Sequence, residues 1–270
     1  MRIEGSVAVV TGGGNGIGRA LASGLVDRGA RVVVADLDGA AAQKVADDID
    51  ARTPGSAVAV AADVSDEDRI REILARAESE FGPVDLYFAN AGVAGRPGLD
   101  IDESVWEQAF DVNLRAHIRA AKLLVPDWVE RGQGYFVSTA SAAGLLTQIG
   151  AAAYSVTKHA AVGFAEWLSV TYGDRGVRVS CLCPMGVDTV LLHAGEESGS
   201  SLGELATRAV VSAGAVLTPE QVAEAVFAAM DEERFLILPH PEVLEMYRHK
   251  GADYDRWIRG MRRYRQSLES

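Results

Sequence analysis

Tyr154 and Lys158 have the residue types and spacing needed to move a proton to or from an oxygen atom. They are four residues apart in a stretch with helical periodicity, so their side chains lie on one face of the expected helix, within reach of one ligand. A free phenol titrates near pH ~10, which is too high for a base at neutral pH. A cation ~4 Å away at an effective dielectric of ~20 contributes about 4 kcal/mol, or roughly three pKa units at most. We therefore expect Lys158 to lower the pKa of Tyr154.

Two further polar residues favour a catalytic site around this pair. Ser141 follows an expected strand and precedes Tyr154 by thirteen residues, and Asn113 lies in an expected long helix. An isolated tyrosine and lysine at this spacing is most often an ordinary surface pair. Together with Ser141 and Asn113, the pair is interpreted as part of a group of four catalytic residues.

A glycine-rich turn near the N-terminus is typical of pyrophosphate binding. Residues 11–18 read Thr-Gly-Gly-Gly-Asn-Gly-Ile-Gly, directly after an expected strand and at the start of an expected helix. Glycines allow a tight turn and close approach of the backbone, and the helix N-terminus offers free N–H groups and a positive dipole end. Such a turn is weak evidence alone, and its position strengthens it. The expected cofactor contacts in the turn are Gly12, Asn15, Gly16, Ile17 and Gly18.

Asp36 follows the second expected strand, 24 residues after Gly12. A carboxylate there can accept hydrogen bonds from both hydroxyls of an adenosine ribose, and it repels a 2′-phosphate. Leu37 comes next and Asn15 lies in the turn, so no arginine or lysine is evident to hold NADP. The sequence thus predicts NAD as the cofactor. The alternative for Asp36 is an ordinary turn residue at the end of a strand.

Two later segments also lie at the carboxyl ends of strands, the edge at which ligands bind in open α/β sheets. Asp63 and Val64 close the third strand, and residues Asn90, Ala91 and Gly92 close the fourth. Asp63 is a candidate partner for the adenine amino group, with Val64 lining that pocket. Asp63 is equally suited to capping a helix before Ser65.

Short β-branched runs alternate with longer helical patterns along the whole chain, which predicts βαβ units and a parallel sheet. The expected strands are residues 7–10, 31–35, 57–62, 84–89, 134–138, 177–182 and 235–238. The expected helices are residues 16–28, 39–51, 66–80, 104–130, 152–172 and 219–231. Several strands are apolar throughout, as in sheets covered on both faces. The sequence predicts a single-domain α/β Rossmann fold over residues 1–270, with a doubly wound parallel seven-stranded sheet and helices on both faces.

Composition limits the partners and the location of the chain. Its 270 residues carry a formal net charge of −12, which disfavours nucleic acid and anionic lipid. Cys181 and Cys183 lack the spacing of a metal or redox pair, so buried thiols and no metal site are expected. We find no charged segment followed by an apolar one of the kind that forms a secretion leader. We also find no apolar run that approaches the ~20 residues of a membrane-spanning helix. A cytoplasmic protein without membrane contact is expected.

The motifs taken together resemble those of the short-chain dehydrogenase/reductase family, in the order and spacing of that family. The resemblance covers about residues 5–240. The matching motifs are the glycine turn at Thr11–Gly18, the triplet Asn90–Gly92, Asn113, Ser141, and the pair Tyr154 and Lys158.

The resemblance implies roles for the four candidate catalytic residues. Tyr154 would exchange a proton with the substrate oxygen, and Lys158 would lower its pKa and bind the nicotinamide ribose. Ser141 would hydrogen-bond the reacting oxygen, and Asn113 would hold a water that links Lys158 to solvent. The resemblance also implies a homo-oligomer, a dimer or homotetramer, built partly from the helices at 104–130 and 152–172.

One segment departs from the family pattern. Where the family has Pro-Gly-x-Val-x-Thr, this chain has Met185 in the place of the glycine, while Pro184, Val187 and Thr189 keep theirs and are expected to contact the cofactor. If the glycine has a positive φ, a methionine there is strained and the local turn differs. The Met185 side chain either faces the nicotinamide or substrate, or simply packs.

Substrate choice is expected to come from three loops, residues 94–99, 145–153 and 185–217. The last is the longest stretch without clear periodicity, and loops of this length are often lids or binding loops. The apolar residues that suggest a substrate pocket are Leu145, Leu146, Ile149, Val190, Leu191 and Leu192. His193 either touches substrate or is a solvated surface residue. No cluster of arginine or lysine near these loops suggests a polyanionic substrate.

Beyond the last strand, residues 242–270 form an extension with apolar residues at helical spacing and a basic flank. We expect it to clamp against the acidic body or a neighbouring subunit, with a solvated appendage or membrane contact as alternatives.

The sequence therefore predicts an NAD-dependent oxidoreductase, a secondary alcohol dehydrogenase or ketone reductase for a small, mostly apolar substrate. The alternative on the same fold is a catalytically silent protein that binds or senses NAD. Such a sensor needs the glycine turn and Asp36 but not the four candidate catalytic residues.

Overall fold

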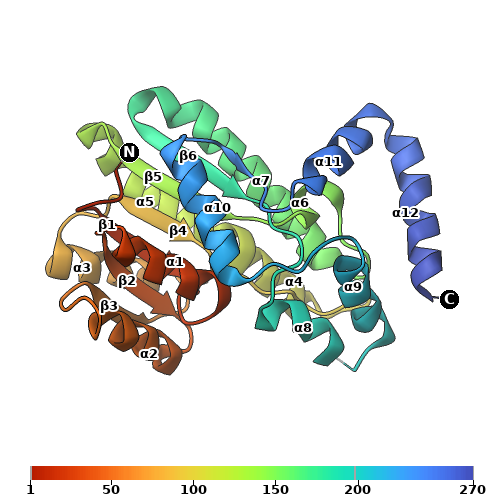
Figure 1. Cartoon of the computed structure of the whole chain (residues 1–270), viewed down its shortest axis with the longest axis horizontal. Coiled ribbons are helices and arrows are strands. Elements are labelled where there is room, and N and C mark those ends of the chain that lie inside the picture. Colours follow the sequence, from red (N-terminus) through yellow and green to blue (C-terminus); the bar gives the residue numbers. More distant parts are fainter. Residues whose placement is uncertain (1, 198, 270) are drawn as a thin grey trace.

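The structure is a computed structural model and describes residues 2–197 and 199–269. Its centre is a seven-stranded, wholly parallel sheet with the order β3-β2-β1-β4-β5-β6-β7 (Figure 1). The strands are β1 (Val7–Thr11), β2 (Arg31–Asp36), β3 (Ala57–Ala61), β4 (Leu86–Ala89), β5 (Gly134–Thr139), β6 (Val177–Leu182) and β7 (Leu236–Ile237). The order reverses between β1 and β4, as in a doubly wound fold. The predicted sheet is confirmed.

Helices cover both faces of this sheet, because successive strand residues point to opposite sides and are apolar on both. On one face lie α3 (Glu67–Phe81), α5 (Ala116–Arg131) and α7 (Ala152–Tyr172). On the other lie α1 (Gly16–Asp27), α2 (Gly39–Asp50) and α10 (Pro219–Asp231). Within β1, Val9 belongs to the first core and Val10 to the second.

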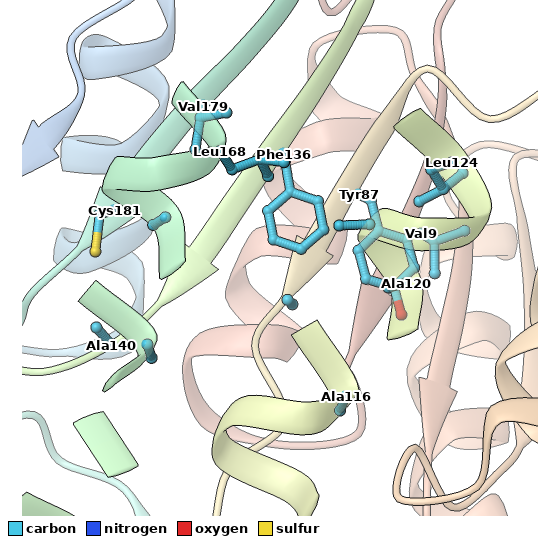
Figure 2. Close-up of a cluster of buried hydrophobic side chains, with 14 of the residues drawn as sticks. Val9, Tyr87, Ala116, Ala120, Leu124, Phe136, Ala140, Leu168, Val179 and Cys181 are labelled. Carbon is cyan, nitrogen blue, oxygen red and sulfur yellow. The ribbon is translucent and has the colours of Figure 1, made fainter. Parts of the chain in front are cut away.

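The core beneath α5 and α7 contains the large aromatic residues of the sheet. Tyr87 and Phe136 are stacked with ring centroids 5.7 Å apart, between Val9 and Leu168 (Figure 2). Such burial contributes roughly 1.5–3 kcal/mol for each large side chain. This core fixes β4 and β5 next to each other, so the segments that follow these strands begin at one edge of the sheet.

Two kinds of helix end follow from local residue chemistry. Thr218 and Gln221 form a capping box around Pro219 at the start of α10. Gly29 and Gly176 have φ of +85° and +86°, the left-handed conformation expected after a helix.

The expected long helix over residues 104–130 is interrupted. It consists of α4 (Glu103–Phe110), one turn of π-helix (Asp111–Arg115) and α5. A π turn inserts an extra residue and shifts the side chains that follow around the axis, and it is common at functional sites. Asn113 lies within this turn.

The long loop predicted over residues 185–217 is wrong, because most of this segment is helical. It contains α8 (Val190–Glu197) and α9 (Ser201–Val211), which pack against each other; Ser198, between them, lies outside the described residues. Short helices rich in glycine and serine carry weak periodicity, and their packing partners are distant in sequence.

The C-terminal extension consists of α11 (Glu242–Ala252) and α12 (Tyr254–Glu269), at one end of the molecule beyond α9 (Figure 1). Tyr264 on α12 donates a hydrogen bond of 2.8 Å to the Ala209 carbonyl of α9. Lys250 of α11, which is buried, donates to the Leu145 carbonyl of α6 (Ala143–Leu146). The expected contact of the extension with the body is therefore present.

Candidate active site

A cavity of about 680 Å³ runs along the carboxyl ends of the central strands. Of the predicted site residues, all but Gly18 and Asn113 line it. These lining residues are Gly12, Asn15, Gly16, Ile17, Asp36, Asp63, Val64, Asn90, Ala91, Gly92, Ser141, Tyr154, Lys158, Pro184, Val187 and Thr189. A second, polar groove of about 330 Å³ between α1, α2 and α10 contains none of them.

Tyr154 and Lys158 project from α7 into this cavity, one turn apart as predicted. The Lys158 ammonium lies 5.7 Å from the centre of the Tyr154 ring and donates a hydrogen bond of 2.8 Å to the Thr139 carbonyl at the end of β5. The Ser141 hydroxyl, just beyond β5, lies close enough to Tyr154 to lower the pKa of the phenol. It donates a hydrogen bond of 3.4 Å to the Pro184 carbonyl and accepts one of 3.1 Å from the Ala143 N–H. The three polar groups thus come together at one point of the cavity wall.

Burial shifts the titration of both residues. It lowers the pKa of Lys158, which is 2% exposed, to about 8. Tyr154 is half-buried, and desolvation of its hydroxyl raises its pKa, opposed by the hydrogen bond with Ser141. The prediction that Lys158 lowers the pKa of Tyr154 is wrong for this structure, because desolvation dominates and the ammonium is directed at Thr139.

Asn113 lies outside the cavity wall and holds the loop that forms it. Its Oδ1 accepts a hydrogen bond of 2.9 Å from the Val93 N–H, and its Nδ2 donates to the Val93 carbonyl at 2.9 Å and to the Thr157 hydroxyl at 3.1 Å. Because Thr157 precedes Lys158, Asn113 joins the loop after β4 to α7. Both hydrogens of its side-chain amide are used in these contacts, while Oδ1 accepts one hydrogen bond of the two it can accept.

Sequence reasoning missed His117, one turn after Asn113. It is 1% exposed, and its Nδ1 lies 3.0 Å from the Ser138 hydroxyl. Burial, with a smaller contribution from the charge of Lys158, lowers the pKa of His117 to about 3. Its Nε2 is the one fully buried side-chain nitrogen or oxygen without a hydrogen bond in the described part of the chain. The one indication in the sequence is that His117 follows Asn113 by four residues, a spacing that places two side chains on one side of a helix.

The glycine turn needs its glycines for different reasons. Gly12 and Gly16 have φ of +61° and +49°, which favours glycine. A Cβ on Gly18 would lie 2.0 Å from the Gly12 carbonyl oxygen, so Gly18 allows α1 to close against the turn. The structure places Gly18 beneath the turn, away from the cavity, and the prediction of a direct cofactor contact for it does not fit this position.

Asp36 has the contacts of a turn residue and also lines the cavity. Its Oδ2 accepts a hydrogen bond of 2.9 Å from the Gly14 N–H, and its Oδ1 accepts one of 3.0 Å from the Asp38 N–H. It is therefore a turn residue that ties β2 to the glycine turn, and its carboxylate also lines the cavity.

Asp63 is likewise both cavity-lining and a turn residue. Its Oδ1 accepts a hydrogen bond of 2.9 Å from the Ser65 N–H, while Asp66 caps α3. Asn90 joins the ends of three strands: its amide donates to the Thr11 carbonyl at 3.0 Å and accepts from the Thr139 hydroxyl at 3.2 Å.

Met185 is not strained. Among the described non-glycine residues, only Thr147 and Glu233 have a positive φ. The Met185 N–H donates a hydrogen bond of 3.1 Å to Nδ1 of His240, whose Nε2 lies 3.0 Å from the Gly186 carbonyl. His240 is 1% exposed and holds the turn in shape. The Met185 side chain lines the cavity and also packs against the core.

The outer half of the cavity is formed by the loop at 93–97, by Gln148, Gly150 and Ala151, and by α8 and α9. Val190, Leu191 and Leu192 line it as predicted. Leu145 and Leu146 do not, because α6 buries them in the core beneath α7. Ile149 does not line it either. His193 lies at the surface with its Nε2 3.1 Å from Asp188, outside the cavity.

No helix in the described part of the chain is both long and apolar enough to cross a membrane. The described residues also contain no group of three or more histidine, cysteine, aspartate or glutamate side chains placed to hold a metal ion.

Comparison with known proteins points to one family. A family model described as short chain dehydrogenase matches residues 6–200. A 1-deoxy-11-beta-hydroxypentalenate dehydrogenase of Streptomyces exfoliatus is 34% identical over 262 residues, which cover 96% of this chain and 91% of the relative. A cyclohexanol dehydrogenase of an Acinetobacter species is 33% identical, with 87% of this chain and 92% of the relative covered.

Solved structures agree with this relationship. A short chain dehydrogenase/reductase from Burkholderia phymatum, crystallised in complex with NAD, superposes with a TM-score of 0.85 at 31% identity. The match covers 94% of this chain and 96% of that one. With sheet order, site geometry and relatives in agreement, the chain belongs to the short chain dehydrogenase family and is an oxidoreductase of the alcohol dehydrogenase type.

Proposed function

We propose that the protein oxidises a small alicyclic secondary alcohol to the ketone, or catalyses the reverse reduction, with NAD(H) as its cofactor. The observation that carries this proposal is one cavity with Asp36 in one part of its wall and Tyr154, Ser141 and Lys158 together in another. Such an arrangement suits a dinucleotide that spans the sheet edge and leaves its reactive ring beside the phenol.

The residues present fit NAD. A Cβ on Gly13 would lie 2.8 Å from Val34, and one on Gly14 would lie 2.9 Å from Ala41, so the turn leaves no room for larger side chains. The backbone of Gly12, Gly16 and Ile17 at the start of α1 would bind the pyrophosphate. Asp36 would bind the adenosine ribose and disfavour NADP.

The remaining contacts follow the cavity wall. Asp63 and Val64 would border the adenine, and Lys158 the nicotinamide ribose. The other proposed contacts along the dinucleotide are Asn15, Asn90, Ala91, Gly92, Pro184, Val187 and Thr189.

On this proposal the substrate hydroxyl lies between Ser141 and Tyr154. In the oxidising direction the phenolate form of Tyr154 accepts the hydroxyl proton, while the hydrogen on the carbon that bears this hydroxyl leaves with its electron pair, which yields the ketone. The bound nicotinamide supplies the acceptor of that hydride. Ser141 holds the oxygen, and Lys158 provides positive charge near the phenol. Because desolvation raises the pKa of Tyr154, its neutral form is favoured, and this form donates the proton in the reducing direction.

The substrate class is inferred from the outer cavity and from the relatives. Val190, Leu191, Leu192 and Val210 make this part of the wall apolar. The names of three relatives contain cyclohexanol, a hydroxypentalenate and a 3beta-hydroxysteroid. All three are secondary alcohols on rings.

The test is nicotinamide absorbance with purified protein over a panel of cyclic secondary alcohols and ketones. Tyr154→Phe should lower kcat by about 10²- to 10⁴-fold, the usual contribution of a positioned acid/base. The control is Tyr247→Phe, on an exposed tyrosine of α11. A Tyr154→Phe enzyme as fast as the parent, or tighter binding of NADP than of NAD, would contradict the corresponding part of the proposal.

A further inference from the structure

The loop that follows β4 forms one side of the mouth of the cavity and is fixed at both ends. Asn113 binds both backbone groups of Val93 at its start. At its end, the Gly98 N–H donates a hydrogen bond of 2.8 Å to the Gly150 carbonyl, next to a bridge between Gly98 and Ala151. Side chains between these two anchors therefore have a defined position over the start of α7.

Arg96 lies between the anchors. Its side chain is exposed and lines the cavity. The neighbouring Gly95 faces Ala153, since a Cβ on Gly95 would lie 3.7 Å from the Ala153 Cβ. Ala153 directly precedes Tyr154, so this loop passes over the substrate end of the cavity rather than the Asp36 end.

Among the described residues that line that part of the cavity, Arg96 is the one exposed charge, since Lys158 is buried. Among the described lining residues, the charged ones are Asp36, Asp63, Arg96 and Lys158. Asp36 and Asp63 lie at the ends of β2 and β3, and the buried Lys158 is hydrogen-bonded to Thr139. Arg96 forms no ion pair with any described residue.

Such an arginine suits an anion. The chain has a formal net charge of −12, which repels an anionic ligand unless a local cation compensates. A guanidinium offers a planar pair of donors that matches a carboxylate. One exposed cation among uncharged neighbours such as Gln148, Leu191 and Val210 matches one negative charge rather than a polyanion.

We propose that the substrate is an alicyclic hydroxy acid, with its hydroxyl at Tyr154 and Ser141 and its carboxylate paired with Arg96 at the cavity mouth. This inference rests on the proposed function, since it defines the far end of the same substrate. It makes Arg96 a specificity-determining residue.

The experiment compares acids with their own neutral esters. The substrates are 4-hydroxycyclohexane-carboxylate, -acetate and -propionate and the three methyl esters, so that the distance from hydroxyl to carboxylate varies. The enzymes are the parent, Arg96→Met, Arg96→Lys and a control, Arg76→Met, which removes the same charge from the exposed surface of α3. The readout is the ratio of kcat/KM for each acid to that for its ester.

For at least one chain length, the parent ratio should exceed one. Arg96→Met should lower it about tenfold, mainly through KM, as expected for loss of a charge-assisted hydrogen bond in a partly solvated site. Arg96→Lys should restore part of the ratio, and Arg76→Met should leave it unchanged. The parent ratio should also fall as salt is raised from 0.01 M to 0.5 M.

The proposal is overturned if Arg96→Met and Arg76→Met give the same ratio, or if the parent prefers every ester. In both cases, oxidation of the neutral esters still tests the proposed function independently of Arg96. If no compound is oxidised, the proposed function fails. Calorimetric titration of the three acids into the parent and Arg96→Met, each with NADH present, then tests the role of Arg96 through binding alone. Weaker binding to Arg96→Met supports the pairing of Arg96 with the carboxylate, and equal affinities overturn it.

Discussion

Tyr154, Lys158 and His117 are three titratable side chains around the end of β5, and burial acts on each of them. It disfavours the charged form, so it raises the pKa of Tyr154 and lowers those of Lys158 and His117. Residue types and spacing identified the first two as a pair. Their spacing could not reveal the degree of burial, which depends on how α5 and α7 pack against the sheet.

Replacing His117 by glutamine should make the protein less sensitive to acid. The pKa of His117 is about 3 in the folded protein, whereas the ordinary value of 6.5 applies in the unfolded chain. Between pH 3 and pH 6.5 the unfolded chain therefore binds more protons than the folded protein. The free energy of unfolding therefore falls as pH falls from 6.5 towards 3, by about 1.4 kcal/mol per pH unit, or about 2 kcal/mol at pH 5. Urea titrations at pH 7 and pH 5 would measure this. Between the two pH values the free energy of unfolding should fall by about 2 kcal/mol more in the parent than in His117→Gln.

The matched control for this measurement is His249→Gln, on an exposed histidine of α11. It should lose as much stability between the two pH values as the parent does. Equal losses in His117→Gln and the parent would show that burial of His117 does not couple folding to protonation.

At the scale of elements, periodicity predicted all strands of the sheet and the helices that cover it. These elements bury whole faces, so the pattern is strong. The helix α7 has the predicted bounds, and β4 and β7 are each two residues shorter than expected. The π turn at Asn113 was not predicted, because a change of period confined to five residues is too short to recognise in the apolar pattern. The assignment of Leu145 and Leu146 to the pocket failed because α6, which buries them, is only one turn long.

The helices α8 and α9 were missed for a related reason. Part of their stability comes from contact with each other and, for α9, with α12. The Tyr264 hydroxyl donates to the Ala209 carbonyl and lies 2.8 Å from the Ser212 hydroxyl. The extension thus supports one wall of the cavity from outside, through groups distant from it in sequence.

Removing the Tyr264 hydroxyl should loosen that wall. Tyr264→Phe loses a hydrogen bond worth about 1 kcal/mol, so amide hydrogen exchange in α9, residues 201–211, should become about fivefold faster. Mass-spectrometric exchange on the parent, Tyr264→Phe and the control Tyr247→Phe would measure this. Unchanged exchange in α9 of Tyr264→Phe would show that α12 does not stabilise it.

At the scale of the whole molecule, the outer face of α7 is unusually apolar. Val156, Trp167 and Val170 are 47%, 55% and 86% exposed. Together with Gly163, where an added Cβ would meet nothing within 4 Å, they share one face of the helix. A contiguous apolar stripe on a chain with a net charge of −12 is typical of a subunit interface, and a symmetric pair of α7 helices would cover it.

We therefore expect a homo-oligomer, a dimer or tetramer, with α7 in its interface. The double substitution Trp167→Glu with Val170→Glu should yield a smaller species in sedimentation velocity, because two carboxylates on each subunit would be buried without partners. Both positions are on the solvent side of α7, so circular dichroism of the variant should still show the parent's helix content.

Arg76→Glu, which introduces a carboxylate on the exposed side of α3, should sediment like the parent. If the parent is already monomeric at 50 μM, or if the double variant sediments like the parent, then this apolar stripe does not form the interface.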